Sequence, residues 1–337
     1  MTAAAQKPAQ SIPVFRASDL TVVNGANLGD ALSFAAELDL DDTYELRLNT
    51  RPRRLSLVPD PDGSFVIGPD TALGRPGATL HLDCCVTLMS TTGQTAELLV
   101  LVEVDGDNHV ENVYALPLAP LVPRIGYSLV GIDRQKARQR FAQVACVSFS
   151  RGTNITMASG EQKSIEALSI GDLVLTRDDG PQAIRWIGQS TVRAVGEFAP
   201  IKINAGALHN ENDLLVSPDH RLFIYQRIDA LGAGRNEVLV RARHLVNGDT
   251  VTRRQGGFVD YFQLLFDRHH IIFAEGIAAE TFLIDTRTRD ALPEELTEAV
   301  EDALPGHQGR RHLSYEVSEA LLDHPDAASL LKKASTR

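Results

Sequence analysis

Three short segments of this 337-residue chain carry side chains suited to nucleophilic and acid–base chemistry. The first holds the hydroxyls of Ser148 and Thr153, and the second reads Ser217-Pro-Asp-His220. The third holds two adjacent imidazoles, His269 and His270. A hydroxyl attacks a carbonyl efficiently only when a nearby group manages its proton, and an imidazole does this near neutral pH. These segments are therefore the candidates for a reactive site.

The elements that must position these residues are predicted to be β strands. Alternating or continuous apolar runs fill the chain from about Ile12 to Asp133 and again from about Cys146 to Asp285. The runs in the first block are separated by turn-forming pairs, which are Asn24-Gly25, Asp62-Gly63 and Asp105-Gly106. Such pairs tolerate the positive φ of tight hairpins. The pattern predicts a mainly β protein, with an antiparallel sandwich or barrel at residues 1–133.

The chain between and after these blocks has a different character. Residues 134–147 contain a basic stretch that could form a short helix, although we expect a solvated linker. After Thr286 the composition becomes helical, with Pro293 at a predicted helix start and a last helix expected from near Pro325 to Lys333. We therefore expect a second β domain at residues 148–286 and a short α-helical appendage at residues 287–337.

Composition limits the classes of function. Lysine and arginine number 33 against 44 acidic residues, giving a net charge of −11, which disfavours nucleic acid and anionic membranes as partners. No apolar run approaches the roughly 20 residues of a membrane-spanning helix, and no secretory leader is visible. We expect a cytoplasmic or leaderless secreted protein. The three cysteines cannot form a disulfide framework, and Cys84-Cys85 is expected to be a buried pair without redox function.

The order and spacing of the three segments resemble the Hint domain, the self-processing module shared by hedgehog C-terminal domains and inteins. The resemblance covers residues 146–286 and is strongest to a bacterial subfamily, whose pattern is matched by Gly171-Asp-Leu-Val-Leu-Thr-Arg-Asp-Asp-Gly-Pro-Gln-Ala-Ile-Arg-Trp-Ile-Gly188. It implies a horseshoe of strands that brings the two ends of the domain together. It also implies autoproteolysis without a cofactor, with the protein's own N-terminal domain as substrate.

The resemblance assigns roles to residues of this chain. Ser148 would be the nucleophile that attacks the carbonyl of Val147 and converts the peptide bond to an ester. His220 would protonate the leaving nitrogen, while Ser217 and Thr153 would support the scissile peptide. A histidine of the third segment would assist cleavage, and the two available alignments select His269 or His270; we favour His269.

The match departs from the family pattern at the nucleophile. The subfamily would place Cys where Ser148 stands, and the sequence leaves open whether this serine is natural or a replacement. A hydroxyl is hardly ionised near neutral pH, so Ser148 is expected to be slow or inactive if the site evolved for a thiol. Cys146 is an alternative nucleophile, because in a strand it would face the same side as Ser148. Its shift by two residues would misplace the attack.

The second departure lies at the far end of the domain. Inteins end there in His-Asn, and the aligned residues here are Glu280 and Thr281. Without the asparagine, full splicing is not expected. The acyl group would be lost by hydrolysis or passed to a small nucleophile or an acceptor protein.

Two other functional classes remain as alternatives. The second block could be a catalytically silent Hint scaffold that carries an N-terminal β interaction or surface-associated domain. A metal-dependent hydrolase built on Asp267, His244 and the two adjacent histidines ranks last, because their spacing matches no zinc pattern. We therefore expect no metal site and no cofactor.

Overall fold

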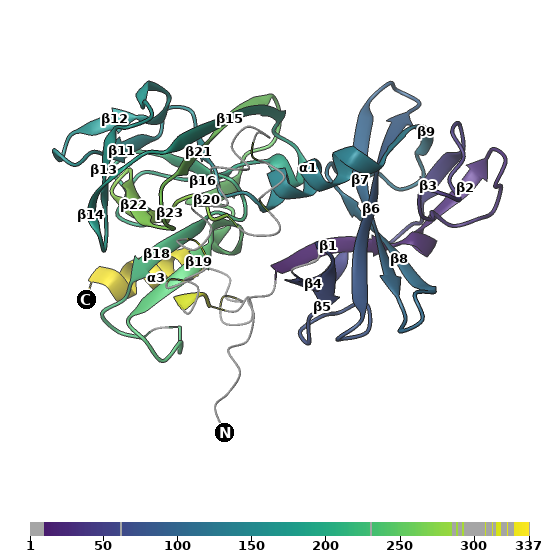
Figure 1. Ribbon diagram of the computed structural model, residues 1–337, viewed down its shortest axis with the longest axis horizontal. Coiled ribbons are helices and arrows are strands. Elements are labelled where there is room, and N and C mark those ends of the chain that lie inside the picture. Colours follow the sequence, from purple (N-terminus) through teal and green to yellow (C-terminus); the bar gives the residue numbers. More distant parts are fainter. Residues whose placement is uncertain are drawn as a thin grey trace. The chain divides into compact units, whose positions relative to one another are not determined.

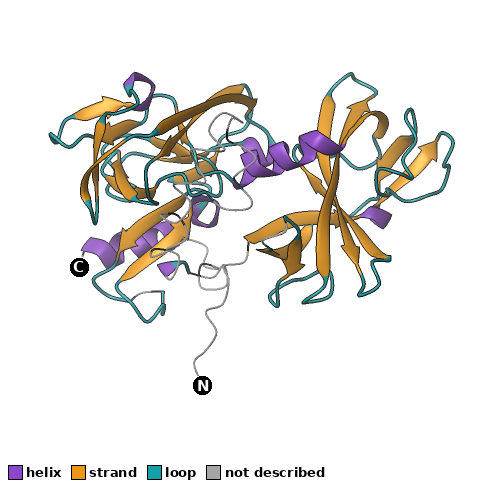
Figure 2. Cartoon of the chain, viewed as in Figure 1, coloured by secondary structure: helices purple, strands orange, loops and turns teal. Residues whose placement is uncertain are grey.

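The computed structural model describes residues 10–60, 63–229 and 231–284, together with residues 288, 292, 307, 312, 315–317, 322 and 327–336. The chain divides into two compact units, and the boundary falls between Gln143 and Val144. Strands form most of the described structure in both units (Figure 2). The fold is therefore mainly β, as the sequence predicts.

The strands of the N-terminal unit form one antiparallel sheet. They are β1 (Gln10–Arg16), β2 (Leu20–Asn24), β3 (Thr43–Leu46), β4 (Arg53–Pro59), β5 (Phe65–Ile67), β6 (Thr79–Ser90), β7 (Thr95–Val104), β8 (Val110–Pro117) and β9 (Gly126–Asp133), with the 3-10 turn η1 (Ala17–Asp19) after β1. Their order is β2-β3-β9-β6-β5-β4-β1-β8-β7, and β7 also pairs with β6. That pairing closes β6, β5, β4, β1, β8 and β7 into a barrel (Figure 1). Closure covers strand edges that would otherwise be open to pairing.

Two of the predicted turn pairs in the N-terminal unit lie in described turns, and they adopt different structures. The Asp105-Gly106 pair lies in the predicted β7–β8 hairpin, where the amide of Asp105 donates to the carbonyl of His109 at 3.0 Å. The Asn24-Gly25 pair does not form a tight hairpin, because β2 pairs with β3 across residues 25–42. Gly25 instead lies against Asp42, where a Cβ would approach the carboxylate oxygen to 2.0 Å. Asp62 lies outside the described residues.

The segment expected to be a solvated linker forms the helix α1 (Arg134–Ala145). Ala137, Phe141 and Ala142 recur at helical spacing and are buried, and the Phe141 ring packs on Phe65 of β5 at 5.1 Å. The basic side chains Lys136 and Arg140 both pair with Glu97 of β7. The linker prediction is wrong here because the basic stretch also contains an apolar face, which its charges obscure.

The second unit contains two antiparallel sheets. One has the order β15-β21-β10-β17-β16-β20, and the other has the order β12-β11-β22-β23-β18-β19 with β13 and β14 attached through β22. The strands are β10 (Phe149–Ser150), β11 (Asn154–Thr156), β12 (Gln162–Ser164), β13 (Leu173–Thr176), β14 (Gly180–Ala183), β15 (Trp186–Arg193), β16 (Ile201–Ile203), β17 (Leu214–Val216), β18 (Arg221–Tyr225), β19 (Glu237–Arg241), β20 (Val251–Arg253), β21 (Phe258–Leu265), β22 (Ile271–Ala274) and β23 (Ile277–Glu280). Three 3-10 turns accompany them, at η2 (Ile165–Ala167), η3 (Gly196–Phe198) and η4 (Ala242–Leu245).

The two-residue strand β10 fixes the geometry of the site. Phe149 pairs with Val216 of β17 on one side and with Phe262 of β21 on the other. Ser148 therefore lies one residue before this double pairing. Ser217 follows Val216 in sequence, and Gln263 follows Phe262. Three segments that are far apart along the chain meet at Ser148.

The two ends of the second β block lie close together. Cys146 packs in one apolar cluster with Leu265, Phe282 and Ile284. The amide of Phe282 also donates to the carbonyl of Leu264 at 2.9 Å. This is the end-to-end closure expected from the Hint resemblance.

The described part of the C-terminal segment packs on the second unit. Helix α3 (Ala327–Thr336) begins two residues after Pro325, close to the predicted start, and buries Ala328 and Leu331 in the main core of this unit. The helix expected from Pro293 lies outside the described residues. None of the helices in the described ranges has the length and apolarity needed to cross a membrane.

Candidate functional site

Ser148 is held at three of its atoms by three different side chains. Its backbone N–H donates to Ser217 Oγ at 3.0 Å, and its carbonyl oxygen lies 3.1 Å from Nδ1 of His220. Its own Oγ accepts a hydrogen bond from Gln263 Nε2 at 3.2 Å. Only 2% of Ser148 is exposed, so these contacts are made out of bulk water. The expected nucleophile is thus fixed through its backbone N–H, its carbonyl and its hydroxyl.

Ser217 connects both sides of the Val147 residue. Its Oγ accepts from the amide of Ser148 and donates to the carbonyl of Cys146 at 3.2 Å, and its own amide donates to the carbonyl of Ser148 at 2.9 Å. A single buried serine therefore fixes the backbone from Cys146 to Ser148. The sequence assigned this residue a supporting role at the scissile peptide, and the structure brings it to that peptide.

His220 lies at the end of the loop between β17 and β18 and is completely buried. Its ring packs against the Phe149 ring at 4.4 Å. Because the Ser148 carbonyl can only accept, Nδ1 carries the hydrogen of their contact. Nε2 has no hydrogen-bond partner among the described residues. The imidazole therefore presents Nδ1 to the Ser148 backbone, and the backbone carbonyl of Glu280 also acts on the ring.

Burial lowers the pKa of His220 below its usual 6.5. The carboxylate of Glu280 and the carbonyls of Ser148 and Glu280 act in the opposite direction but do not outweigh burial. The ring is consequently neutral near pH 7, and a neutral imidazole can accept a proton and then donate it.

The hydrogen bond of His220 differs from the one expected from the sequence. The expected target was the nitrogen of the scissile peptide, whereas the ring bonds to the carbonyl of the same residue, Ser148. The nitrogen is occupied by Ser217 Oγ instead. The carbonyl oxygen that the imidazole contacts and the nitrogen that must be protonated both belong to Ser148, so the ring contacts the expected residue at a different atom.

Gln263 is a site residue that the sequence analysis missed. It faces Gly188 across the β15–β21 pair, and a Cβ on Gly188 would lie 2.6 Å from Gln263 Oε1 and 2.2 Å from the Trp186 ring. The glycine thus leaves the space in which the glutamine amide reaches Ser148. The signal in the sequence was Gly188, the last residue of the segment that carries the Hint resemblance, but that pattern does not indicate which side chain lies opposite it.

His269 and His270 are both buried, and the described ion-pair partners of their rings are carboxylates that do not bond to Ser148. Nε2 of His269 lies 3.3 Å from Glu280, and Nδ1 of His270 lies 3.2 Å from Asp179. Burial lowers the pKa of His270. In the described structure neither ring bonds to Ser148, so the choice of an assisting histidine stays a prediction.

The two remaining candidates occupy different places. Thr153 is buried, and its Oγ1 donates to the carbonyl of Ser150 at 2.8 Å, so it stabilises the turn after β10 and does not contact the scissile peptide. Cys146 lies in the bend between α1 and β10 rather than in a strand, and its side chain belongs to the apolar cluster described above. The strand alternation that suggested Cys146 as an alternative nucleophile therefore does not apply to it, and that alternative stays a prediction.

Both sequence neighbours of His220 are buried charges with arginine or carboxylate partners. Asp219 pairs with Arg243 at 2.8 Å and with Arg241 at 3.4 Å. Arg221 places its NH1 3.0 and 3.2 Å from the two oxygens of Glu280. Burial alone would raise the pKa of Glu280, but Arg221 and the neighbouring imidazoles together outweigh it and keep that pKa low. Each charged neighbour of His220 is therefore paired with a group of opposite charge, Asp219 with arginines and Arg221 with Glu280.

The residues aligned with the intein terminus have other partners. Glu280 is engaged with Arg221 and faces His269. Thr281 exchanges two bonds with His270, its amide donating at 2.9 Å and its Oγ1 accepting at 3.0 Å. Neither side chain can cyclise as an asparagine does. Asp267, one of the weighed metal ligands, is bound by Arg185 at 2.7 and 2.8 Å.

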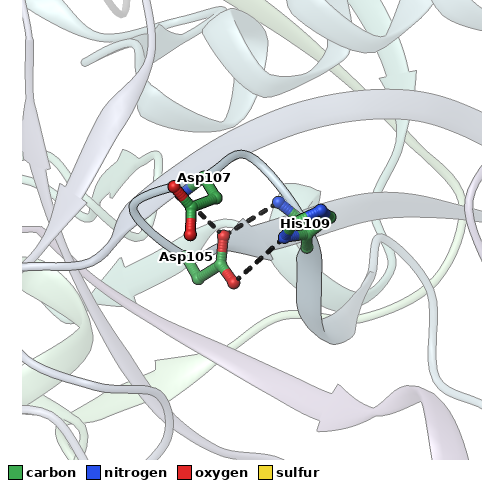
Figure 3. A group of neighbouring side chains, drawn as sticks. All are labelled: Asp105, Asp107 and His109. Carbon is green, nitrogen blue, oxygen red and sulfur yellow. Dashed lines mark hydrogen bonds and ion pairs between the residues drawn. The ribbon is translucent and has the colours of Figure 1, made fainter.

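A group of possible metal ligands lies in the β7–β8 hairpin of the barrel, remote in sequence from Ser148. Asp105, Asp107 and His109 offer one ligand atom each, all within 4.8 Å of one another (Figure 3). The Asp105 carboxylate accepts from the amides of Asp107 and His109 at 2.9 Å each, which is the pattern of a stabilised turn. These bonds account for the arrangement without an ion.

Comparisons with known proteins agree with this interpretation of the second unit. Residues 147–286 match the family model of the Hint domain, and this part of the chain is a Hint domain with a Hint-type autoprocessing fold. A solved structure of the gp41-1 intein, in a variant with three substitutions, aligns with 12% identity and a TM-score of 0.25 over 40% of this chain and 98% of the intein.

A curated relative covers a smaller part. The catalytic subunit of the V-type proton ATPase of Candida tropicalis is 32% identical over 89 residues, which is 26% of this chain. The chain spans only 8% of that protein's length.

Proposed function

We propose that the protein cleaves its own backbone at the Val147–Ser148 bond by an N-to-O acyl shift. The observation that carries the proposal is the triple restraint of Ser148 by Ser217, His220 and Gln263 in a buried site. Holding a nucleophile and a proton carrier around one peptide replaces a rare encounter by a fixed geometry. Val147 is also buried, so water has little access to the bond before cleavage.

The proposed reaction conserves its atoms within the chain. Ser148 Oγ attacks the Val147 carbonyl carbon and the C–N bond breaks. The Nδ1–H of His220, which lies at the Ser148 backbone, gives its proton to the released nitrogen, and the hydroxyl proton replaces it on the ring. The product is an ester between Val147 and Ser148 with a free amine at position 148. Water or another nucleophile then takes the acyl group, which restores the serine hydroxyl and frees the barrel unit from the Hint unit.

Gln263 and Ser217 have distinct parts in this scheme. The Gln263 amide donates to Ser148 Oγ and so favours the negative charge that develops on that oxygen. Ser217 bonds to the amide of Ser148 and to the Cys146 carbonyl, which holds the backbone on both sides of the bond that breaks. Glu280 and Thr281 offer no route to a second cut, so we propose cleavage without splicing.

With serine as the nucleophile the acyl shift should be slow, so replacing Ser148 by cysteine tests the proposal. A thiol is partly ionised near neutral pH and forms a more labile acyl link, so Ser148→Cys should accelerate the shift. We expect the Ser148→Cys protein to give fragments of about 147 and 190 residues on incubation with dithiothreitol. Ser150→Cys is the matched control, because it puts a thiol at another buried serine, two residues along the same segment.

The two outcomes separate the proposal from its main alternative. Thiol-dependent cleavage of Ser148→Cys, with an intact Ser150→Cys chain, supports self-processing. A Ser148→Cys chain that stays intact over days at neutral pH contradicts it. The Hint unit would then be a silent scaffold, and the function would be sought in binding by the barrel.

A further inference from the structure

A carboxylate from outside the Hint-matched segment enters the charged cluster beside His220. Glu316 forms a parallel bridge between its backbone and Leu239 of β19, and the next amide, of Val317, donates to the Leu239 carbonyl at 3.1 Å. Further along the chain, Leu322 and helix α3 are buried in the same core. The described C-terminal residues are thus a structural part of the Hint unit, although they follow residue 286.

Glu316 lies between two buried arginines. Its Oε1 is 3.1 Å from Arg221 Nε and 2.8 Å from Arg241 Nε. Those two arginines are directly opposite each other in the β18–β19 pair, and each side chain is only 7% exposed. Like charges that face each other across two strands repel, and burial strengthens the repulsion. One carboxylate shared by both guanidinium groups removes the conflict.

The two arginines also hold the groups around His220. Arg221 follows His220 in sequence and binds Glu280, whose carboxylate faces His269. Arg241 contacts Asp219, the residue that precedes His220. Glu316 therefore connects Arg221, which follows His220 on β18, to Arg241 of β19, which contacts Asp219.

We infer that Glu316 is a positioning residue for self-cleavage, which keeps His220 against Ser148 by neutralising Arg221 and Arg241. The inference rests on the proposed function. It extends the self-processing unit beyond the Hint-matched segment to the described residues 315–317, 322 and 327–336.

A role at His220 is distinguishable from a role in stability alone by the pH dependence of cleavage. The charged groups that act on His220 are Glu280 on β23 and Arg221 on its own segment, and these belong to one buried cluster with Asp219, Arg241, Arg243 and Glu316. Removing the Glu316 charge leaves this surrounding more positive, which disfavours the protonated imidazole. The limb of the rate profile that reports His220 should therefore move to lower pH.

The experiment uses the full chain with Ser148→Cys as the parent and compares single-turnover cleavage rates across pH. Glu316→Gln is expected to slow cleavage about 10- to 100-fold and to shift the limb by roughly half a pH unit. Glu316→Asp keeps the charge but is too short to serve both arginines equally, so we expect slower cleavage with an unshifted limb. Glu237→Gln is the matched control, since it removes a carboxylate on β19 that pairs with Arg177.

Each outcome decides a separate point. A parent that does not cleave defeats the proposed function, and the inference falls with it. A parent that cleaves, with Glu316→Gln matching its rate and pH profile, overturns the inference alone. If Glu316→Gln does not fold, Glu316→Asp decides, because cleavage at the parent rate contradicts a positioning role. An equal shift in Glu237→Gln would also contradict it.

Discussion

Each unit of the molecule contains a completely buried glutamate, and the two carboxylates have different kinds of hydrogen-bond partners. Glu103 in the barrel receives neutral donors, which are the Tyr114 hydroxyl at 2.6 Å, the Asn112 amide at 2.9 Å and a backbone N–H at 2.9 Å. Glu280 in the Hint unit is paired with the charged Arg221 and faces an imidazole. Both carboxylates are shielded from water, but only the second belongs to a network of ionised groups.

The two sites differ in whether their buried polar atoms all have hydrogen-bond partners. In the described part of the Hint unit, His220, His269 and His270 each have a buried ring nitrogen without a hydrogen-bond partner, whereas the Glu103 oxygens are occupied. Buried polar groups are normally satisfied, and the exceptions concentrate where chemistry is done. This contrast favours a structural role for the barrel glutamate and a functional role for the Hint-unit cluster.

The largest expected effect comes from removing the central imidazole. In the Ser148→Cys parent, His220→Gln should reduce the cleavage rate about 100-fold or more, because the imidazole is the group bonded to Ser148 that titrates near neutral pH, whereas Ser217 and Gln263 do not. Intact-mass measurement over time gives the rate. His81→Gln, at an exposed histidine of the barrel, should cleave like the parent. Retention of the parent rate in His220→Gln would remove the basis for the assignment.

A matched pair of substitutions tests the two glutamates themselves. Glu280→Gln should lower the free energy of unfolding of the Hint unit by about 3 kcal/mol, because it breaks a fully buried ion pair, and should slow cleavage. Glu103→Gln should cost the barrel about 1–3 kcal/mol and leave the cleavage rate unchanged.

Trp186, the single tryptophan of the chain, reports the Hint unit during urea unfolding. Its transition should move in Glu280→Gln and not in Glu103→Gln. Equal effects of both substitutions on this transition and on cleavage would abolish the contrast between the glutamates.

The Hint unit should also lose stability in acid before the N-terminal unit does. In the Hint unit, the folded pKa of His220 lies below 6.5, and that of Glu316 is lowered to about 2, since Arg221 and Arg241 outweigh burial. Their stabilisation is lost as pH falls, first below 6.5 and then from 4.5 towards 2. In the N-terminal unit, burial raises the pKa of Cys85 on β6 to about 11 and that of Tyr44 on β3 to about 12.

Those groups of the N-terminal unit keep their contribution at low pH and lose it as pH rises past 9 and 10, their unfolded values. Acid titration followed by Trp186 fluorescence should therefore show the Hint unit unfolding while far-ultraviolet circular dichroism still reports barrel strands. Simultaneous loss of both signals in acid would contradict the prediction that the Hint unit is the more acid-sensitive of the two units.

The sequence predicted the reactive segments because their residue types are distinctive. Ser148, Ser217 and His220 could be selected as one group before their contacts were known, and the structure places all three together. The predicted β character and the β7–β8 hairpin follow from local patterns of the same kind. Local patterns are short-range information, and they suffice where neighbouring residues decide the structure.

The parts that escaped prediction depend on register between distant strands. Gln263 reaches Ser148 only because Phe149 pairs with Phe262, and Glu316 reaches Arg221 only through the bridge at Leu239. No spacing in the sequence encodes either pairing. Helix α1 was missed for a different reason, since the apolar face of Ala137 and Phe141 is narrow and interleaved with charges.

The position of the cut tests the central claim most directly. Mass spectrometry of the C-terminal fragment from the Ser148→Cys chain, with sequencing of its new N-terminus, identifies the bond that breaks. Attack by the side chain at position 148 on the preceding carbonyl predicts a fragment that begins at position 148 and continues to Arg337. A fragment that begins at Cys146, or anywhere else, would contradict the account.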